Sequence, residues 1–577
     1  MNRNQVETIL LKENYRINPM GEIVNSKNDP IANIIPIPKK QIRVKREMQD
    51  EVYIELLVII DDNKQIDNIK LPALDMSNLK WIPSCLGMDA IVYPGKEKEF
   101  LLIIKKLFRH VETVQEYSNI GWIKQSDGQY KYLDYNGSLG DGGIKVNIED
   151  NFRKYTFPRE DGYVEVAVKQ VLALLGVVEK RIAYVLLSLV YLCPLLEFIG
   201  QKSKLPEFVV WLYGFTGTHK TTIAKLFLSH FGNFNSGVPA SFNDTYASIE
   251  RKAYKLKDSL LLLDDFCPQQ SYKETQNINT SAEKVVRAYG DRTSRGRLTV
   301  TMESQTQFVP RGMMLITGES TVPGNSTVAR LIPIGLNKDS VNLNKLTEAQ
   351  EHTDLLGISM REYILWIEKE VNSNCEDFVD TLNSNYKVWL DDIRKNAVET
   401  HGRSYEAVAW LLVALDLMYQ FFGSIGVVKE EEAGLALEEA REEFLELIKV
   451  KDELTKADNP IELFLDTIKN LLTSQSITIK DLDSGEVIGN KYKAIEGYCD
   501  SEYYYFNSNT IYGLVKIKLS KAGVYFQLPI RALLKQLADE AIIKVEDKNN
   551  LPKKTIKNED RTTTRLRLLH IKRQYLD

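Results

Sequence analysis

The chain has 577 residues, of which 44% are hydrophobic and 27% charged. These values predict a folded protein of about three to five domains and exclude a largely disordered chain. The net charge of −5 does not decide whether nucleic acid is a partner, because basic patches occur in acidic chains. The five cysteines form no C-x-x-C pair, so we expect neither a disulfide framework nor a structural zinc site.

Two features bear on location. Residues 1–7 lack the apolar core of a signal peptide. The most apolar stretch, Ile182 to Leu196, contains Pro194 and falls short of the roughly 18 to 20 residues that a membrane span requires. We therefore expect a buried helix there, no membrane association and a cytoplasmic location.

Residues 1–155 are predicted to form a mixed, β-rich domain. Strand-like runs include 52–60 and 121–124, and a helix at about 97–115 interrupts them. No catalytic constellation appears in this region, so we interpret it as a scaffold, a collar or a DNA-binding domain. From Val164 to about Phe198 the apolar spacing is helical, and residues 156–204 are predicted to be a helical lead-in to the next domain.

An apolar strand at 208–213 runs directly into a glycine-rich turn that ends in Lys220 and Thr221. Such a turn wraps the phosphates of a nucleoside triphosphate with backbone N–H groups, and the helix that follows directs its positive end toward them. Lys220 would reach the β and γ phosphates, and Thr221 would bind Mg²⁺. The alternative is a strand-to-helix turn that holds no phosphate. The predicted nucleotide-binding residues are Gly214, Phe215, Thr216, Gly217, Thr218, His219, Lys220, Thr221 and Thr222.

About 40 residues further on, the segment 259–266 is a continuous apolar run that ends in two carboxylates. A run of this kind is typical of a parallel strand covered on both faces, and its carboxyl end lies where such sheets bind ligands. We interpret it as a Walker B element. Asp264 would hold Mg²⁺ through water, and Asp265 would polarise the attacking water.

A third predicted strand, 312–319, brings Thr317 to the position of a sensor of the γ-phosphate or of the water. A short helix at 326–330 and a strand at 331–336 follow, with Arg330 at their junction. An arginine there can reach the γ-phosphate held by a neighbouring subunit, which would require a ring. The alternative is a surface arginine.

The segment between the second and third strands is predicted to contain a helix near 282–288, an arginine-rich turn at 291–297, and a hairpin that pairs 298–302 with 307–309. Its arginines could contact DNA phosphates or a neighbour's nucleotide, or could belong to an exposed structural turn. They are Arg292, Arg295 and Arg297. The nucleotide-binding core as a whole is predicted to span 205–345.

Residues 346–458 are predicted to be a helical lid and linker. A helix opens at about 401–410, and Arg403 in its first turn is the candidate sensor 2 arginine. In the C-terminal part, 459–577, a helix at 529–539, a strand at 541–545, a polar loop at 546–564 and a strand at 565–571 favour a winged helix.

The last 30 residues hold nine Lys or Arg against three Asp or Glu, which favours DNA contact by this region. Its candidate DNA contacts are Lys553, Lys554 and Arg565.

Together these motifs resemble the AAA+ ATPases and, within them, the minichromosome-maintenance-like (MCM-like) helicases that bacterial mobile elements, such as staphylococcal cassette and pathogenicity-island elements, encode for their own replication. The resemblance covers 160–577. It depends on the loop Gly214 to Thr221 without a glycine before its lysine, on Arg330 directly before a strand, and on Gly402 to Glu406 as the sensor 2 helix start. It implies an α/β AAA+ core of a parallel sheet flanked by helices, ATP and Mg²⁺ as cofactors, and a hexamer.

The sequence also departs from that family. Asp265 stands where glutamate is usual, 236–258 is too short for a long insert after the second helix, the hairpin tip 303–306 lacks the expected lysine, and the cysteine spacing excludes a zinc ribbon. Our first hypothesis is a helicase that loads itself at a replication origin and unwinds duplex DNA into single strands, with a primase or polymerase of the same element as a partner. The alternatives are a non-unwinding ATPase, which would be an origin-binding initiator, loader or defence remodeller, and a nucleotide-gated DNA-binding scaffold.

Overall fold

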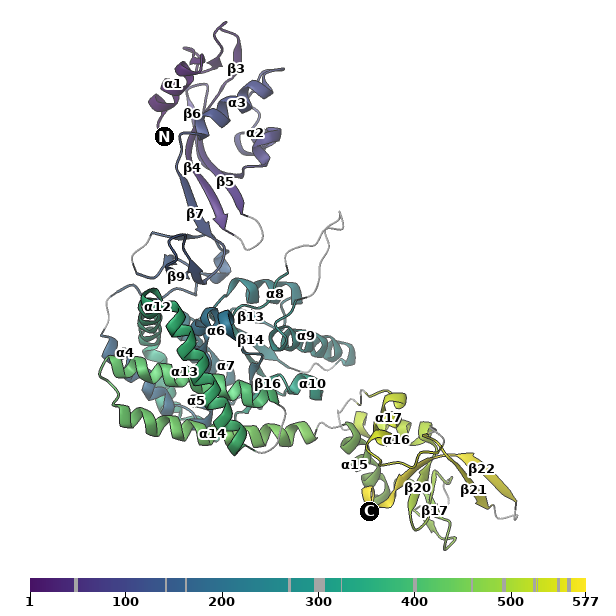
Figure 1. The fold of residues 1–577 in the computed structure, drawn as a ribbon. Coiled ribbons are helices and arrows are strands. Elements are labelled where there is room, and N and C mark those ends of the chain that lie inside the picture. Colours follow the sequence, from purple (N-terminus) through teal and green to yellow (C-terminus); the bar gives the residue numbers. More distant parts are fainter. Residues whose placement is uncertain are drawn as a thin grey trace. The chain divides into compact units, whose positions relative to one another are not determined.

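The structure is a computed structural model that describes residues 1–45, 50–140, 143–160, 163–267, 271–294, 307–322, 324–397, 402–457, 460–489, 494–521, 526, 528–546, 550–557 and 562–577. The chain divides into two compact units (Figure 1). The first comprises Met1–Thr321, Arg330–Asn396 and Gly402–Leu445, and the second comprises Val322–Ala329, Ala397–His401 and Glu446–Asp577.

The N-terminal part of the first unit is β-rich, as predicted. Its main sheet has the order β11-β7-β4-β5-β6, in which β4, β5 and β6 are antiparallel and β7 runs parallel to β4. Helices α1 (Arg3–Lys12), α2 (Trp81–Leu86) and α3 (Glu97–Phe108) contribute buried residues to the core of this part. The strands of the main sheet are β4 (Ile34–Lys45), β5 (Glu51–Ile60), β6 (Lys64–Pro72), β7 (Thr113–Tyr117) and β11 (Lys145–Val146).

The helix predicted at 97–115 is shorter than expected, because α3 ends at Phe108 and β7 begins at Thr113. The β-branched pair Thr113 and Val114 favours a strand, and both residues pair with β4. A small antiparallel sheet precedes β4 and consists of β1 (Arg16–Ile17), β2 (Ile23–Val24) and β3 (Pro30–Ala32).

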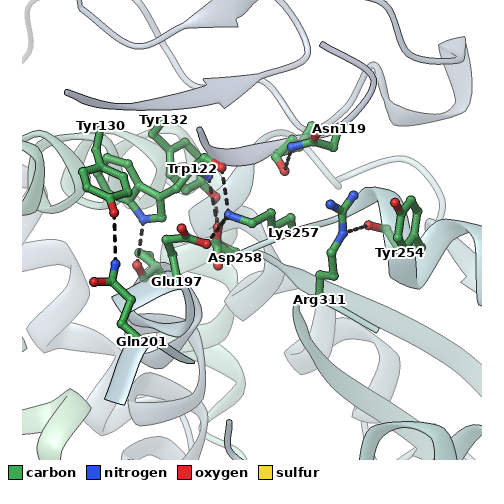
Figure 2. A network of polar contacts seen from close by, with 12 residues as sticks. Asn119, Trp122, Tyr130, Tyr132, Glu197, Gln201, Tyr254, Lys257, Asp258 and Arg311 are labelled. Atoms are coloured by element: carbon green, nitrogen blue, oxygen red, sulfur yellow. Dashed lines mark hydrogen bonds and ion pairs between the residues drawn. The ribbon is translucent and has the colours of Figure 1, made fainter. Parts of the chain in front are cut away.

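A second small sheet, formed by β8 (Gly121–Lys124), β9 (Tyr130–Asp134) and β10 (Gly137–Ser138), docks on the segment that leads into β14 (Leu260–Phe266). Figure 2 shows the polar contacts at this joint. The Trp122 amide donates to the Asp258 carboxylate at 3.0 Å, and the Lys257 ammonium donates to the Trp122 carbonyl at 2.8 Å. The Tyr132 hydroxyl donates to the Asp258 carbonyl at 2.8 Å. A Cβ at Gly121 would lie 2.2 Å from the Lys257 carbonyl oxygen, so only glycine permits this approach.

The predicted nucleotide-binding core contains a five-stranded parallel sheet in the order β13-β14-β15-β12-β16. The strands β12, β14, β15 and β16 are buried along most of their length, as their continuous apolar runs predicted. The fold is therefore mixed α/β with a parallel sheet. The elements are β12 (Val209–Tyr213), α7 (Lys220–Leu228), β13 (Ala240–Ser241), α8 (Tyr246–Lys255), β14, α9 (Tyr272–Gly290), β15 (Met313–Gly318) and β16 (Leu331–Gly335).

Long helices cover the rest of the first unit. Two segments of the described residues, Lys180–Lys202 and Gly402–Ser424, are long and apolar enough to cross a membrane, but 94% and 78% of their most apolar windows are buried inside the protein. The first is longer than predicted, because Pro194 lies in a 3₁₀ turn that joins two helices. The helices are α4 (Val164–Ala173), α5 (Lys180–Leu192), α6 (Leu196–Lys202), α11 (Leu343–Glu351), α12 (Thr353–Asn396), α13 (Gly402–Ser424) and α14 (Glu430–Ala457), of which α14 belongs to the second unit from Glu446 onward.

The second unit differs in part from the prediction. The helix predicted at 529–539 is present as α17 (Ile530–Asp539), but 541–545 forms only an isolated bridge at Ile543. The predicted loop 546–564 contains β21 (Lys553–Lys557), which pairs with β22 (Thr563–Arg567). A five-stranded sheet that the sequence did not indicate has the order β18-β17-β19-β20-β23.

The other elements of this unit are α10 (Asn325–Val328), α15 (Pro460–Thr473), β17 (Ile479–Asp481), β18 (Val487–Ile488), β19 (Gly497–Cys499), β20 (Tyr503–Phe506), α16 (Ser508–Lys521) and β23 (Leu569–Lys572).

Candidate nucleotide-binding site

The glycine-rich turn lies between the end of β12 and the start of α7. His219 has a φ of +64°, a left-handed conformation that explains why glycine is the usual residue there. A Cβ at Gly214 would lie 2.2 Å from the Leu336 carbonyl oxygen, so this position requires glycine. The Lys220 ammonium donates to the carbonyls of Gly214 at 2.7 Å and Phe215 at 2.9 Å. Burial lowers the pKa of Lys220, although the carboxylates of Glu319 and Asp264 act in the opposite direction.

The Asp264 carboxylate connects two other predicted site residues, Thr221 and Thr317. The Thr221 hydroxyl donates to Asp264 Oδ1 at 2.8 Å, and the Thr317 hydroxyl donates to the same oxygen. Thr317 is 1% exposed, and its hydroxyl also accepts from the Asp265 backbone N–H at 3.2 Å. The ends of β14 and β15 and the first turn of α7 therefore meet at one carboxylate.

This oxygen cluster is of the kind that Mg²⁺ uses, because Mg²⁺ is bound through one or two carboxylates together with waters and substrate phosphates. Asp264 and the Thr221 hydroxyl are the protein groups that could hold it. Among the described residues, no cluster of three or more His, Cys, Asp or Glu side chains could hold a metal by itself. Asp264 and Thr221 therefore fit a Mg²⁺ ion that binds together with a triphosphate.

Asp265 lies on the exposed side of this cluster and has a φ of +67°. The ladder between β14 and β15 shifts register between Leu263 and Phe266, so the strand is irregular where Asp265 lies. Asp265 therefore lies at the same edge of the sheet as Asp264, but its left-handed backbone orients its side chain differently from that of a residue in a regular strand.

Sequence reasoning assigned no role to Glu319, which lies directly after β15. Its carboxylate accepts from the Thr216 hydroxyl in the glycine-rich turn and from the Cys267 thiol at 3.3 Å. These hydrogen bonds, first from Thr216 and then from Cys267, hold the pKa of Glu319 below its usual value. The sequence could have indicated Glu319, because a carboxylate directly after a parallel strand lies at the edge of the sheet where the other candidate residues meet.

Arg330 and Arg403 lie together, away from the glycine-rich turn. Arg330 donates to the Asp291 carboxylate through Nε at 2.9 Å and Nη2 at 2.8 Å, and Arg403 donates to the same carboxylate at 3.1 Å. Burial acts to raise the pKa of Asp291, but the bonds from both arginines hold it below its usual value. The Arg330 carbonyl accepts from the N–H of Val209, the first residue of β12. Gly214 follows the last residue of that strand, so the glycine-rich turn begins five strand residues, or roughly 16 Å, further along β12.

Of the three arginines predicted to contact DNA in the first unit, the structure describes only Arg292. The Arg292 guanidinium donates to the backbone carbonyls of Pro206, Pro310 and Gly312, at 2.7 to 3.3 Å. It is therefore directed inward as a structural arginine, and burial lowers its pKa to about 10. Arg295, Arg297 and the predicted hairpin strand 298–302 lie outside the described residues.

In the second unit, the three predicted DNA contacts lie on the β21–β22 hairpin, where Lys554 is directed differently from Lys553 and Arg565. Lys554 donates to the Asp500 carboxylate and to the Tyr505 hydroxyl, each at 2.7 Å, so its ammonium is already occupied. Lys553 pairs in register with Arg567, and Arg565 lies two residues from Arg567 on the same strand. The side chains of Lys553, Arg565 and Arg567 are exposed on one face of the hairpin. The sequence prediction omitted Arg567.

Comparison with known proteins gives two kinds of match. A family model described as a domain of unknown function (DUF927) matches residues 31–295. A solved structure titled "SCCmec type IV Cch - active helicase" aligns with 97% of this chain and 97% of its own, at 12% identity and a TM-score of 0.59. A JCV helicase structure aligns with 44% of this chain and 66% of its own, at 13% identity and a TM-score of 0.23, which is too low to carry an argument. No curated protein matches the chain.

The full-length alignment shows that this chain shares its fold with a protein described as an active helicase. The coarse part of the predicted resemblance, a helicase-like fold, is therefore supported. The match does not distinguish MCM-like helicases from other helicases.

Proposed function

We propose that this protein is an ATP-dependent DNA helicase of the AAA+ type, which loads itself at a replication origin of a mobile element and unwinds DNA for its replication. The observation that carries the proposal is the convergence of Thr221, Asp264 and Thr317 at a single carboxylate oxygen. Three segments that are distant in sequence would thus supply two groups for a metal ion and one sensor, beside the turn that would hold the phosphates, as ATP hydrolysis requires.

In this site the backbone N–H groups of the turn and Lys220 would hold the phosphates. Lys220 now donates to the carbonyls of its own turn, and a triphosphate would give its ammonium phosphate oxygens instead. Asp264 and Thr221 would hold Mg²⁺, which neutralises phosphate charge when bound. Thr317 would orient the γ-phosphate or the attacking water through the hydroxyl that now bonds to Asp264.

The positions of the two arginines support assembly into a ring, which we propose to be a hexamer. Arg330 lies roughly 16 Å along the sheet from its own glycine-rich turn, which is further than an arginine side chain reaches. Arg403 shares Asp291 with it. If either arginine neutralises a γ-phosphate, that phosphate must therefore belong to a neighbouring subunit. Arg330→Ala should then abolish hydrolysis while leaving ATP binding nearly unchanged.

A mixing experiment tests this arrangement. Arg330→Ala and Lys220→Ala chains are each inactive in the proposal, but a mixed ring would contain some interfaces with an intact Lys220 and an intact Arg330. Partial recovery of ATP hydrolysis on mixing is expected. Absence of recovery, in mixtures whose co-assembly is shown by mass measurement, would contradict an arginine supplied by the neighbour.

We extend the proposal to the other regions of the chain. Residues 346–458 would be a lid and 459–577 a winged-helix domain, with DNA held by the hairpin face of Lys553, Arg565 and Arg567. The N-terminal domain would be a collar or a DNA-binding domain. A primase or polymerase of the same element is the expected partner, and the cytoplasm is the expected location.

Strand displacement on a forked duplex with ATP and Mg²⁺ tests the proposed activity, with Lys220→Ala as the matched control. Separation by the wild type alone supports a helicase. The second candidate is a non-unwinding loader or remodeller, and it is favoured by the absence of a lysine from the tip 303–306. DNA-stimulated ATP hydrolysis without strand separation would select that candidate.

A further inference from the structure

The structure contains a third carboxylate at the nucleotide site, besides Asp264 and Asp265. Glu319 follows β15, and its backbone N–H donates to the Phe266 carbonyl at 2.9 Å, so its position is fixed against the end of β14. Its side chain spans the gap between two motifs, because one oxygen accepts from Thr216 in the glycine-rich turn and the other from Cys267 after the Walker B strand.

We propose that Glu319 is the carboxylate that activates the attacking water, and that its bond to Thr216 holds it in place while the turn is empty. This inference rests on the proposed ATPase function. Thr216 is the third residue of the turn that begins at Gly214, so its hydroxyl belongs to the loop that would wrap the phosphates. A carboxylate bonded to that hydroxyl would lie beside a triphosphate held by the turn, where an attacking water is needed.

Electrostatics support the same role. The Glu319 carboxylate acts to raise the pKa of Lys220, against the lowering that burial causes. The hydrogen bonds from Thr216 and Cys267 favour the ionised form of Glu319 and hold its pKa below the usual value. When a triphosphate draws the Thr216 hydroxyl away, the carboxylate loses one of these donors and becomes a stronger base.

The sequence explains why Asp265 is less suited to the task. An aspartate is one methylene shorter than the glutamate that is usual at its position, and the left-handed backbone at Asp265 directs its side chain differently from that of a regular strand. Glu319 supplies the longer side chain from the neighbouring strand, since β14 and β15 are hydrogen-bonded up to Phe266 and Gly318.

The proposed step is a hydrolysis that needs no further reactant. The water oxygen forms a bond to the γ-phosphorus, and the bond from that phosphorus to the bridging oxygen breaks, so that ADP leaves with the electron pair. The water proton moves to the Glu319 carboxylate and passes to solvent after phosphate release. Lys220 stays charged throughout and stabilises the transferring phosphoryl group.

The test compares four full-length proteins: wild type, Glu319→Gln, Asp265→Asn and the exposed control Glu348→Gln. ATP affinity is measured with a fluorescent ATP analogue, and hydrolysis is measured in a single turnover with Mg²⁺. Glutamine retains an acceptor for the Thr216 hydroxyl but cannot take a proton, so a merely structural role would survive the change. We expect Glu319→Gln to slow hydrolysis about 100-fold or more, with an affinity within about threefold of wild type. Glu348→Gln should behave as wild type.

Three results would overturn the assignment while leaving the proposed function intact. Hydrolysis by Glu319→Gln within about threefold of wild type would exclude it as the base, and a large loss in Asp265→Asn alone would give the role to Asp265. A loss of ATP affinity equal to the loss of hydrolysis would make Glu319 a binding residue. If the wild type neither binds nor hydrolyses ATP, the proposed function itself fails, and the assignment of Glu319 fails with it.

Discussion

Replacing Asp258 should loosen the joint between the β8–β9 hairpin and the segment before β14 (Figure 2). Its carboxylate is 1% exposed and accepts from the Trp122 N–H at 3.0 Å and the Lys257 ammonium at 2.7 Å. In Asp258→Ala, the unsatisfied N–H costs about 1 to 3 kcal/mol. Lys257 keeps Glu197 at 2.8 Å, so its lost bond adds only about 1 kcal/mol. Alanine at a φ of +51° adds about 1 kcal/mol more, so the total is about 4 kcal/mol.

Hydrogen exchange of the peptide 119–134 measures this loss directly, because slowly exchanging amides report the free energy of local opening. A loss of about 4 kcal/mol corresponds to exchange that is several hundredfold faster. Asp258→Asn tolerates the left-handed backbone and retains one acceptor, so its effect should be intermediate. Asp127→Ala, in an exposed turn of the same hairpin, should change exchange elsewhere in the peptide very little. An acceleration below about fivefold in Asp258→Ala would refute the reasoning.

Three further predictions concern other parts of the chain. Gly214→Ala should abolish binding of a fluorescent ATP analogue, because its Cβ would lie 2.2 Å from the Leu336 carbonyl oxygen; unchanged affinity would contradict the turn geometry. Burial lowers the pKa of His230 to about 4, below the unfolded value of about 6.5, so the stability that the neutral form provides is present above pH 6.5 and is lost as the pH falls toward 4. Wild type should therefore lose about 2 kcal/mol more than His230→Gln between pH 7 and pH 5, as measured by thermal unfolding. Replacing Arg565 and Arg567 by Ala should weaken duplex binding and reduce the salt slope by about 2, and an unchanged slope would remove this face from the DNA interface.

The parallel strands were predictable because their signal is local. A fully buried strand needs only a short continuous apolar run, and the segment 259–266 matches β14 to within one residue. The helix near 282–288 was found because α9 keeps an apolar face, although its full extent, Tyr272–Gly290, was missed. Because the candidate side chains lie near the carboxyl ends of such strands, the meeting of Asp264 with Thr317 could also be anticipated.

Features that depend on distant partners could not be predicted. The end of α3 is set by the pairing of β7 with β4, about 70 residues earlier in the chain, and the C-terminal sheet depends on similar pairings. Arg292 reads as a surface arginine until Pro206 and Gly312 supply its acceptors. Asp291 gains its role only because arginines from two distant elements reach it.

The strand β14 joins two polar clusters of the first unit, the joint at Asp258 and the nucleotide site at Asp264, and this arrangement argues for coupling between them. The segment before its first residue contains Asp258, which binds the hairpin, and its far end contains Asp264, which binds Thr221 and Thr317. Between these ends the strand is buried and hydrogen-bonded to β13 and β15, so it should move as a rigid body. Occupation of the nucleotide site should therefore alter hydrogen exchange in the hairpin. An ATP analogue should slow hydrogen exchange of the peptide 119–134 in wild type, but much less in Asp258→Ala. Equal slowing in both proteins would show that the effect does not pass through this joint.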